Sequence, residues 1–318
     1  MHSKYLSNSV SLFATIIILA FTNISMANDL PTVRVGVLSY GTINWEIDTI
    51  KHHELDKKLG INVEAVKLTT KNAAAIALQG KAVDVILTDL FWVIKQGGKF
   101  KMHPTHKLSG GLYAKAINTQ VNDINTLGVA GGANDKNLLV YKAYLKKKNQ
   151  SLTSELKYGA PPLLNEMMLT GKIDGLINFW HYNARLDASG FHNVLTTQSM
   201  LTTLNIKSEV PLLGWVFHRD FVDGAHEQLQ RFIKASQQAK KLLLNQHADD
   251  WARLKPKMKA KSEKEYLALI QHYPSTIITD EKTEIEASAK QLFDEIKGLK
   301  DQNLFQDDEL FPQNLFID

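Results

Sequence analysis

A glycine-lysine motif followed by a short apolar strand occurs twice in this chain. The first copy, from Gly80 to Trp92, reads GKAVDVILTDLFW, and the second, from Gly171 to Trp180, reads GKIDGLINFW. In each copy a helix-patterned apolar run stops at the glycine, which can take the left-handed conformation that ends a helix. Since ligands bind outside the carboxyl ends of parallel strands in open α/β sheets, the two copies predict two half-sites that face each other.

The chain starts with the pattern of a secretory signal peptide. Lys4 precedes an apolar run from Leu12 to Phe21, and Ser25, Met26 and Ala27 form a small-x-small cleavage pattern. A membrane anchor is the alternative, but the run is shorter than the roughly 20 residues that span a bilayer. We therefore expect removal of residues 1–27. The absence of cysteine excludes disulfides, thiolate metal sites and a lipid-modified cysteine, so we expect a free protein in a periplasm.

Charge and length narrow the function further. The chain has 37 lysines and arginines against 33 acidic residues, an excess too weak to indicate a nucleic-acid partner. About 290 residues remain after removal of the signal, which favours two domains. His52, His53 and Asp56 suggest a metal at first sight, but adjacent helical residues point about 100° apart. Only one of these histidines can share a face with Asp56, and no metal site or cofactor is expected.

Three consecutive strand-turn-helix units open the mature chain. The strands are expected at 33–38 and 63–68 and within the first motif copy, and the first two are followed by the polar turns 39–45 and 69–72. This alternation predicts a parallel sheet with crossover helices. Backbone N–H groups at such helix starts can bind an anion or a polar ligand group. The alternative is an ordinary turn in which Thr42, Asn44, Thr70 or Asn72 merely caps the helix.

A second set of such units follows residue 116. A strand at 127–130 leads through the turn from Gly131 to Asp135 into a helix, and a strand at 156–158 precedes the second motif copy. The extended run 209–217 then returns, and the pattern is helical from Phe221 onward. We expect a clamp in which residues 28–115 and 215–318 form the first lobe and residues 116–214 the second. Hinges are expected at 112–118 and 209–213.

These units, in this order, resemble the periplasmic solute-binding proteins of ABC importers. The resemblance is to the branch that serves nitrate, taurine, alkanesulfonates and thiamine-pyrimidine precursors. It rests on the first motif from Gly80 to Thr88, the strand-glycine-helix unit 128–139, the second motif with 182–186 after it, and the run 214–221. It implies an α/β, two-lobed, type II-like periplasmic-binding-protein fold with parallel-rich sheets flanked by helices. A ligand cleft between the lobes and delivery to a membrane permease are implied as well.

The resemblance also implies a ligand shell. In the first lobe it falls on the first strand-helix turn, the second helix start and the end of the motif strand, namely Tyr40, Gly41, Thr42, Asn44, Thr70, Asn72, Thr88 and Asp89. In the second lobe it falls on Gly132, Ala133, Asn134 and Phe179. Aromatic residues in or beside these segments extend the list of expected ligand-binding residues to Trp45, Trp92, Trp180 and His181. Trp45 and Trp92 have an equally good interpretation as core residues.

One departure from the family pattern bears on the ligand. Relatives often have Trp-Asp-Pro-Tyr where this chain has Phe179, Trp180, His181 and Tyr182, so the acid and the proline are replaced. The aromatic surface suits a planar ring or an alkylammonium group, and Asp89 could accept a hydrogen bond from an amine. We therefore expect a small organic ligand, with a pyrimidine-like heterocycle ahead of an organosulfonate.

Two other function classes use or resemble this fold. An enzyme is not expected, because related pyrimidine-synthesising proteins depend on a cysteine-rich segment that is missing here, and no Gly-x-Ser-x-Gly or His-Glu-x-x-His motif occurs. A ligand-binding sensor, or an accessory protein for a periplasmic enzyme system, would use the same clamp as an importer component, so the sequence leaves this alternative open. In either role we expect a monomer.

Overall fold

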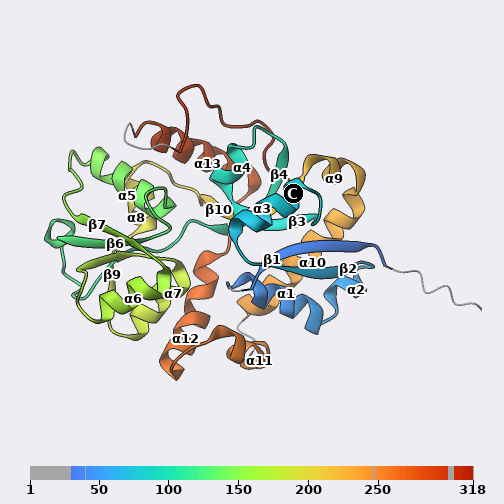
Figure 1. Ribbon diagram of the computed structural model, residues 1–318, viewed down its shortest axis with the longest axis horizontal. Coiled ribbons are helices and arrows are strands. Elements are labelled where there is room, and N and C mark those ends of the chain that lie inside the picture. Colours follow the sequence, from blue (N-terminus) through green and yellow to red (C-terminus); the bar gives the residue numbers. More distant parts are fainter. Residues whose placement is uncertain (1–29, 40, 246–247, 300–303, 318) are drawn as a thin grey trace, which may run out of the picture.

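The computed structural model describes residues 30–39, 41–245, 248–299 and 304–317 of the 318-residue chain. The expected signal peptide at 1–27 and the candidate ligand residue Tyr40 lie outside these ranges. Two lobes, each built on a five-stranded sheet, lie side by side (Figure 1). No helix within the described ranges has the length and apolar character that a membrane span requires.

The first sheet has the strand order β2-β1-β3-β10-β4. Strand β1 pairs in parallel with β2 and β3, whereas β10 runs antiparallel to both of its neighbours. The strands are β1 (Thr32–Leu38), β2 (Asn62–Leu68), β3 (Val85–Asp89), β4 (Phe100–Lys107) and β10 (Pro211–His218). The helices that connect them are α1 (Ile43–His52), α2 (Leu55–Lys58), α3 (Lys71–Gln79) and α4 (Leu90–Ile94). The three predicted strand-turn-helix units are therefore present.

The second sheet repeats this plan with the order β7-β6-β8-β5-β9. Strand β6 pairs in parallel with β7 and β8, and β5 runs antiparallel to β8 and β9. The strands are β5 (Gly111–Ala114), β6 (Thr126–Ala130), β7 (Glu155–Gly159), β8 (Gly175–Ile177) and β9 (His192–Thr196). The helices are η1 (Val121–Asp123), α5 (Lys136–Lys147), α6 (Pro161–Leu169), α7 (Trp180–Ala188) and α8 (Thr197–Thr203). Both sheets are mixed rather than purely parallel.

The two motif copies have the same structural role in their sheets. Asp84 accepts a hydrogen bond from the backbone N–H of Arg34 (2.8 Å), and Asp174 accepts one from Thr126 (2.9 Å). Each aspartate thus joins the motif to the first residues of the neighbouring parallel strand. Gly171 has the expected left-handed conformation (φ +68°), but at the first copy Lys81 (φ +57°) takes it instead of Gly80. That expectation is wrong by one residue, because Gly80 still occupies the last helical turn.

The C-terminal third contacts both lobes. Its helices are α9 (Arg219–Gly224), α10 (His226–Leu244), α11 (Ala248–Met258), α12 (Glu263–His272), η2 (Tyr273–Thr276) and α13 (Lys282–Lys297). Helix α10 packs with α1 against the first sheet, while α12 packs on α7 and α13 on α5 of the second lobe. In Figure 1, α12 and α13 lie at opposite ends of the region between the two sheets.

The strand pairings differ from the expected lobe boundaries at two points. Strand β5 falls in the range assigned to the first lobe but pairs with β8 and β9 of the second sheet, and β10 begins at Pro211 in the first sheet. The apolar, glycine-containing run 107–116 continues from β4 into β5 with only residues 108–110 between them, so composition gives no sign of where the chain changes sheets. Helix α12, also assigned to the first lobe, packs on the second.

A buried ion pair ties α10 to α1. Lys240 Nζ lies 3.0 Å from Glu46 Oε1, and the two residues are 6% and 1% exposed. Ser236 Oγ donates to the same carboxylate oxygen and accepts from Trp215 Nε1 at 2.8 Å. Burial lowers the pKa of Lys240, and Glu46 opposes this shift. Lys240 is therefore a buried cation whose charged form is stabilised by Glu46.

We predict that Lys240→Met lowers the free energy of unfolding by about 3–5 kcal/mol, because it leaves Glu46 as an unpaired buried carboxylate. The double variant Lys240→Met, Glu46→Leu should recover most of that loss, because it removes both charges. Denaturant unfolding measures both, with Lys57→Met on the exposed surface as a control that leaves stability close to unchanged. A double variant no more stable than the single one would contradict the prediction.

Candidate functional site

The helices that follow the parallel strands begin where the two lobes meet. Lys71 is the first residue of α3 and Lys136 the first residue of α5, one in each lobe. Unpaired backbone N–H groups and the helix dipole favour a negative charge at such helix starts. A lysine side chain at each of them adds a full positive charge. This part of the interface is therefore suited to an anion.

Both lysines reach across to the other lobe. Lys136 Nζ lies 3.3 Å from Asp89 Oδ1, at the end of β3, and 5.7 Å from the centre of the Phe91 ring. Lys71 Nζ lies 5.6 Å from the centre of the Phe179 ring, which precedes α7. We call Lys71, Asp89, Lys136 and Phe179, together with Asp135, the interlobe cluster.

Asp135 has an unusual pKa in this cluster. Its side chain caps α5 by accepting a hydrogen bond from Leu138 N (3.0 Å). Burial raises the pKa of this carboxyl to about 6, although the hydrogen bonds to the helix start and the charges of Lys136 and Lys71 act in the opposite direction. Lys71, which belongs to the other lobe, thus contributes to the electrostatics of Asp135. The charge of the cluster therefore changes near neutral pH.

The predicted residues of the first lobe mostly shape their turns. Asn44 Nδ2 donates to the carbonyl oxygens of Leu38 (3.1 Å) and Gly41 (3.0 Å), and Thr70 Oγ1 accepts from Ala73 N (3.0 Å). These are the capping and turn roles that the sequence left as the alternative. Thr42 holds the N-cap position without a side-chain bond, Asn72 is exposed, and Thr88 pairs through the backbone with Gly214 of β10.

Asp89 combines two roles. Its Oδ1 accepts a hydrogen bond from Trp92 N (3.1 Å), which caps α4, and the same oxygen faces Lys136. Trp92 itself packs beside Phe100, with 5.3 Å between the ring centres. Asp89 is thus a predicted residue of the first lobe that forms an ion pair with the second.

In the second lobe, the turn between β6 and α5 contains Gly132, Ala133 and Asn134, and the last two are exposed. The N–H of Asp135 bonds to the carbonyl of Gly132 (3.0 Å), which closes the turn. The turn brings Asp135 and Lys136 into the cluster, and neither was among the predicted ligand residues. A charged pair at the first positions of a helix after a two-glycine turn was the signal that could have identified them.

Two of the predicted aromatic residues belong to a packed cluster that joins the lobes. Trp45 of α1 is 4% exposed and meets Trp180 of α7 edge to face, with 6.0 Å between the ring centres. Trp251 and Tyr273 from the C-terminal third pack on the same ring at 5.8 and 6.4 Å. The core interpretation therefore describes the position of Trp45.

His181 stands between that cluster and Phe179. Burial and the charge of Arg185 lower the pKa of His181 to about 3, so its imidazole is neutral at physiological pH. Its Nδ1 atom is buried and has no hydrogen-bond partner within the described ranges. The ring lies 6.3 Å from that of Phe179. Within the same ranges, no group of three or more His, Asp or Glu side chains is placed to hold a metal ion.

Known proteins resemble this chain in structure rather than in sequence. No family model matches this sequence, and no curated protein has a significant match to it. Many solved structures do match. The periplasmic aliphatic sulphonate binding protein SsuA from Escherichia coli has 17% identity and a TM-score of 0.66, over 83% of this chain and 85% of its own.

Two further structures are similar over more of this chain. An ABC transporter protein from Parabacteroides distasonis has 12% identity and a TM-score of 0.65, over 90% of this chain and 99% of its own. The alkanesulfonate-binding protein SsuA from Xanthomonas axonopodis pv. citri, bound to MOPS, has 13% identity and a TM-score of 0.62, over 90% and 96%. These similarities confirm the predicted architecture: the chain has the periplasmic-binding-protein fold.

Proposed function

We propose that this protein is the periplasmic substrate-binding component of an ABC importer and that it captures a small organic anion between its lobes. The observation that carries the proposal is the pair of lysines, Lys71 and Lys136, which stand at helix starts of opposite lobes and point across the interface. Several proteins that share the fold are components of ABC import systems, and some bind sulfonates. A permease in the inner membrane is the partner that this role requires.

The interlobe cluster favours one of the two ligand classes expected from the sequence. A pyrimidine-like ligand was expected to donate an amine to Asp89, but that carboxylate is already paired with Lys136. An organosulfonate would instead meet two lysines and two helix starts, and its organic part could lie against the ring of Phe179. We therefore place an organosulfonate ahead of a pyrimidine-like heterocycle. Catalysis has no part in this proposal.

Binding between lobes implies closure. A ligand that contacts Lys71 on one lobe and Lys136 on the other stabilises the arrangement in which both contacts exist, and so shifts an open-closed equilibrium. The expected hinges at 112–118 and 209–213 overlap β5 and β10, so we place the hinges instead at 108–110 and 204–210, where the chain passes between the sheets. The same clamp could serve a sensor or accessory protein, and adjacent permease and ATPase genes would distinguish import from that role.

The proposed ligand class leads to a test with sulfonates. Alkanesulfonates and taurine should raise the melting temperature, and Lys71→Gln or Lys136→Gln should weaken their binding about tenfold or more, the effect of losing one charge-assisted hydrogen bond. Calorimetry in a sulfonate-free buffer measures this, with Lys172→Gln as an exposed control. Stabilisation by inorganic anions alone, or by aminopyrimidines alone, would refute the ligand class.

Affinity should also depend on pH. The pKa of Asp135 is about 6, so this carboxyl is mostly neutral at pH 5 and ionised at pH 7.5, where it repels an anion and competes for the lysines. A sulfonate remains ionised throughout. We expect its affinity to fall about fivefold to tenfold over this range, the equivalent of roughly one pKa unit of interaction. Asp135→Asn keeps a good helix cap and should flatten the profile; an equal slope in this variant would assign the titration to another group.

Closure of the lobes can be measured in solution. X-ray scattering at saturating ligand should give a smaller radius of gyration than scattering without ligand, because the lobes approach each other. The Lys71→Gln, Lys136→Gln double variant should keep the ligand-free radius at the same ligand concentration. An unchanged radius of the wild-type chain at saturation would show that binding does not close the lobes.

A further inference from the structure

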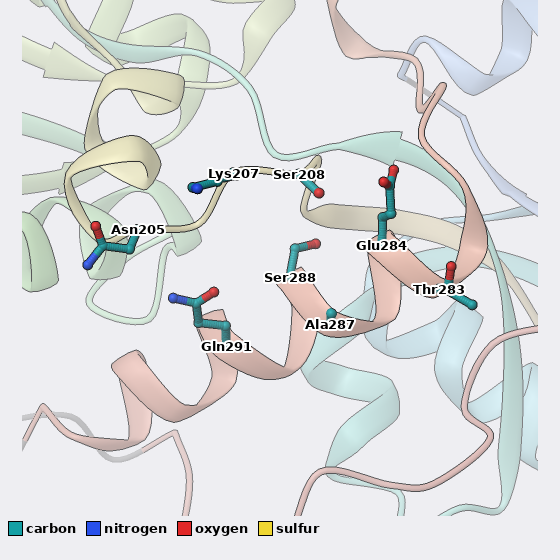
Figure 2. Close-up of a pocket in the computed structure, with 8 residues that line it drawn as sticks. All are labelled: Asn205, Lys207, Ser208, Thr283, Glu284, Ala287, Ser288 and Gln291. Atoms are coloured by element: carbon teal, nitrogen blue, oxygen red, sulfur yellow. The ribbon is translucent and has the colours of Figure 1, made fainter.

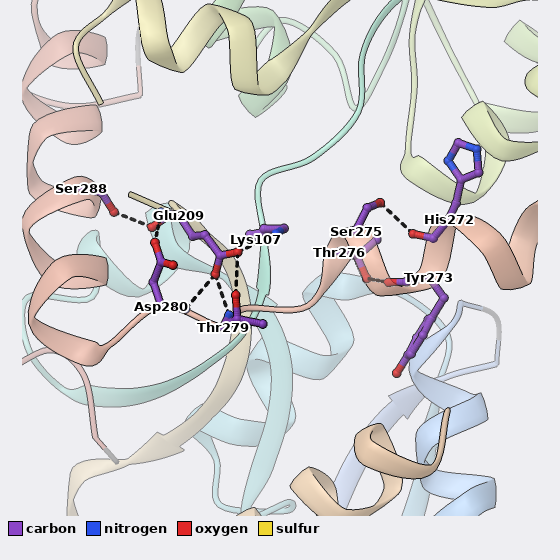
Figure 3. A network of polar contacts seen from close by, with 9 residues as sticks. All are labelled: Lys107, Glu209, His272, Tyr273, Ser275, Thr276, Thr279, Asp280 and Ser288. Carbon is purple, nitrogen blue, oxygen red and sulfur yellow. Dashed lines mark hydrogen bonds and ion pairs between the residues drawn. The ribbon is translucent and has the colours of Figure 1, made fainter. Parts of the chain in front are cut away.

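Glu209 lies in the chain segment that leads from α8 back to β10. Its carboxylate holds four hydrogen bonds from two other segments (Figure 3). Oε1 lies 2.5 Å from Lys107 Nζ, at the end of β4, and accepts from Thr279 Oγ1 (3.1 Å). Oε2 accepts from the backbone N–H groups of Thr279 (2.6 Å) and Asp280 (3.0 Å), which precede α13.

The backbone of Glu209 completes the same connection. Its N–H donates to Asp280 Oδ2 (2.7 Å), and its carbonyl accepts from Ser288 Oγ of α13 (2.5 Å). One residue later, the carbonyl of Val210 accepts from Leu108 N (2.8 Å). Three passages of the chain, at 107–110, at 204–210 and at 277–280, are therefore joined at one residue. The first two of them are the links between the sheets.

The carboxylate is ionised in this setting. Glu209 is only 13% exposed, and burial alone would raise its pKa, but the bonds from Lys107, Thr279 and Asp280 outweigh burial and lower the pKa below its ordinary value. A charge-assisted hydrogen bond is about twice as strong as a neutral one. Substitution by glutamine would keep the shape, yet an amide nitrogen cannot accept the hydrogen bonds that one of the two oxygens now receives.

One side of the segment beside this residue faces an open pocket. A pocket of about 400 Å³ separates residues 205–208 from α13 (Figure 2). It is lined on one side by Asn205, Lys207 and Ser208 and on the other by Thr283, Ala287 and Gln291. The other side of the passage is close-packed, because Leu204, Ile206 and Val210 are buried in the core that α13 also joins. Glu209 adds a charged link with several hydrogen bonds to this apolar packing.

We infer that Glu209 is a positioning residue for the interlobe site: by joining the three passages it fixes the angle at which the two lobes meet, and so the distance across which Lys71 and Lys136 act. The effect on ligand affinity rests on the proposed function. The effect on lobe orientation does not, because it is a property of the chain without ligand. Glu209 lies outside the interlobe cluster and acts through the hinge.

The test measures lobe orientation directly. The chain has no cysteine, so Lys67→Cys in β2 and Glu155→Cys in β7, both exposed and on the outer strands of the two sheets, give one pair of spin labels. Double electron–electron resonance on ligand-free protein measures the distance between the two labels. Its distribution in Glu209→Gln should be shifted from that of wild type or broader than it. Glu284→Gln, the same change at an exposed position on α13, should leave the distribution unchanged.

Ligand affinity provides the second readout. Glu209→Gln should weaken sulfonate binding about tenfold, mainly through faster dissociation, because a less populated closed state lowers apparent affinity in proportion. Wild-type distances in Glu209→Gln, even with a lower melting temperature, would make the residue merely structural and overturn the inference. If Glu209→Gln does not fold, Lys107→Gln decides: it keeps the bonds from Thr279 and Asp280, and unchanged distances in this variant overturn the inference as well. Failure to bind any sulfonate would refute the proposed function alone.

Discussion

The first lobe depends on one strand that arrives last. Strand β10 comes back from the second lobe and inserts between β3 and β4, antiparallel to both. Trp215 and Phe217 of this strand fill the core against Phe232 of α10. At Gly214 the chains approach so closely that a Cβ atom would lie 2.5 Å from the carbonyl oxygen of His103. The first sheet is therefore completed by a strand that follows the whole second sheet in the sequence.

Two contacts between the lobes near the proposed site differ in strength. The pair Lys136–Asp89 is about one-fifth exposed on each side and is worth about 1 kcal/mol or less, because water screens it. The rings of Trp45, Trp180, Trp251 and Tyr273 add about 0.5–1.5 kcal/mol for each aromatic pair, beyond the area they bury. On these magnitudes the lobes part more easily at the lysines than at the aromatic cluster. Under the proposed function, the lysine side would be the entrance for a ligand.

The sequence predicted what local pattern and period determine. The strand-turn-helix units, the repeated motif and the return of the chain after residue 209 all follow from short-range signals, and the structure contains each of them. The left-handed residue at Lys81 was missed, because glycine is the usual residue in that conformation but Gly80 here is the C-cap of the helix. The change of sheet before β5 was missed, because the run 107–116 is apolar and contains glycine on both sides of the boundary.

The site was less predictable for a different reason. Asn44 and Thr70 carry the same side chains whether they cap a helix or bind a ligand, so the pattern alone could not choose. The pair Lys136–Asp89 joins residues far apart in sequence whose distance depends on how two lobes dock, and no periodicity reports that. Lys71 and Lys136 were visible only as charges at helix starts.

The divergence between the two motif copies explains the asymmetry of the interlobe cluster. Asp89 ends β3 and faces Lys136. Counted from the matching Asp84 and Asp174, its counterpart is Phe179. Thr88 corresponds to Asn178, which is buried and donates to Pro161 O (3.0 Å) and Asn165 Oδ1 (2.8 Å). Phe179, one residue later, takes the position that faces the lysine of the opposite lobe. Lys136 is thus neutralised by a carboxylate, while Lys71 meets an aromatic ring and has no ion pair within the described ranges.

An anion that enters between the lobes would therefore meet two lysines in different states. To bind Lys136 it must compete with Asp89, a partner of the same charge as itself. To bind Lys71 it displaces no carboxylate, and the contact with Phe179 can remain, because a ring offers its face to a cation and its edge or face to the organic part of a ligand. Under the proposed function, Lys71 would consequently be the stronger anchor for the acidic group, and Lys136 would become available as Asp89 is drawn away. In the second motif copy, Phe179 stands where the first copy has Asp89. This difference makes the two sides of the interlobe cluster unequal.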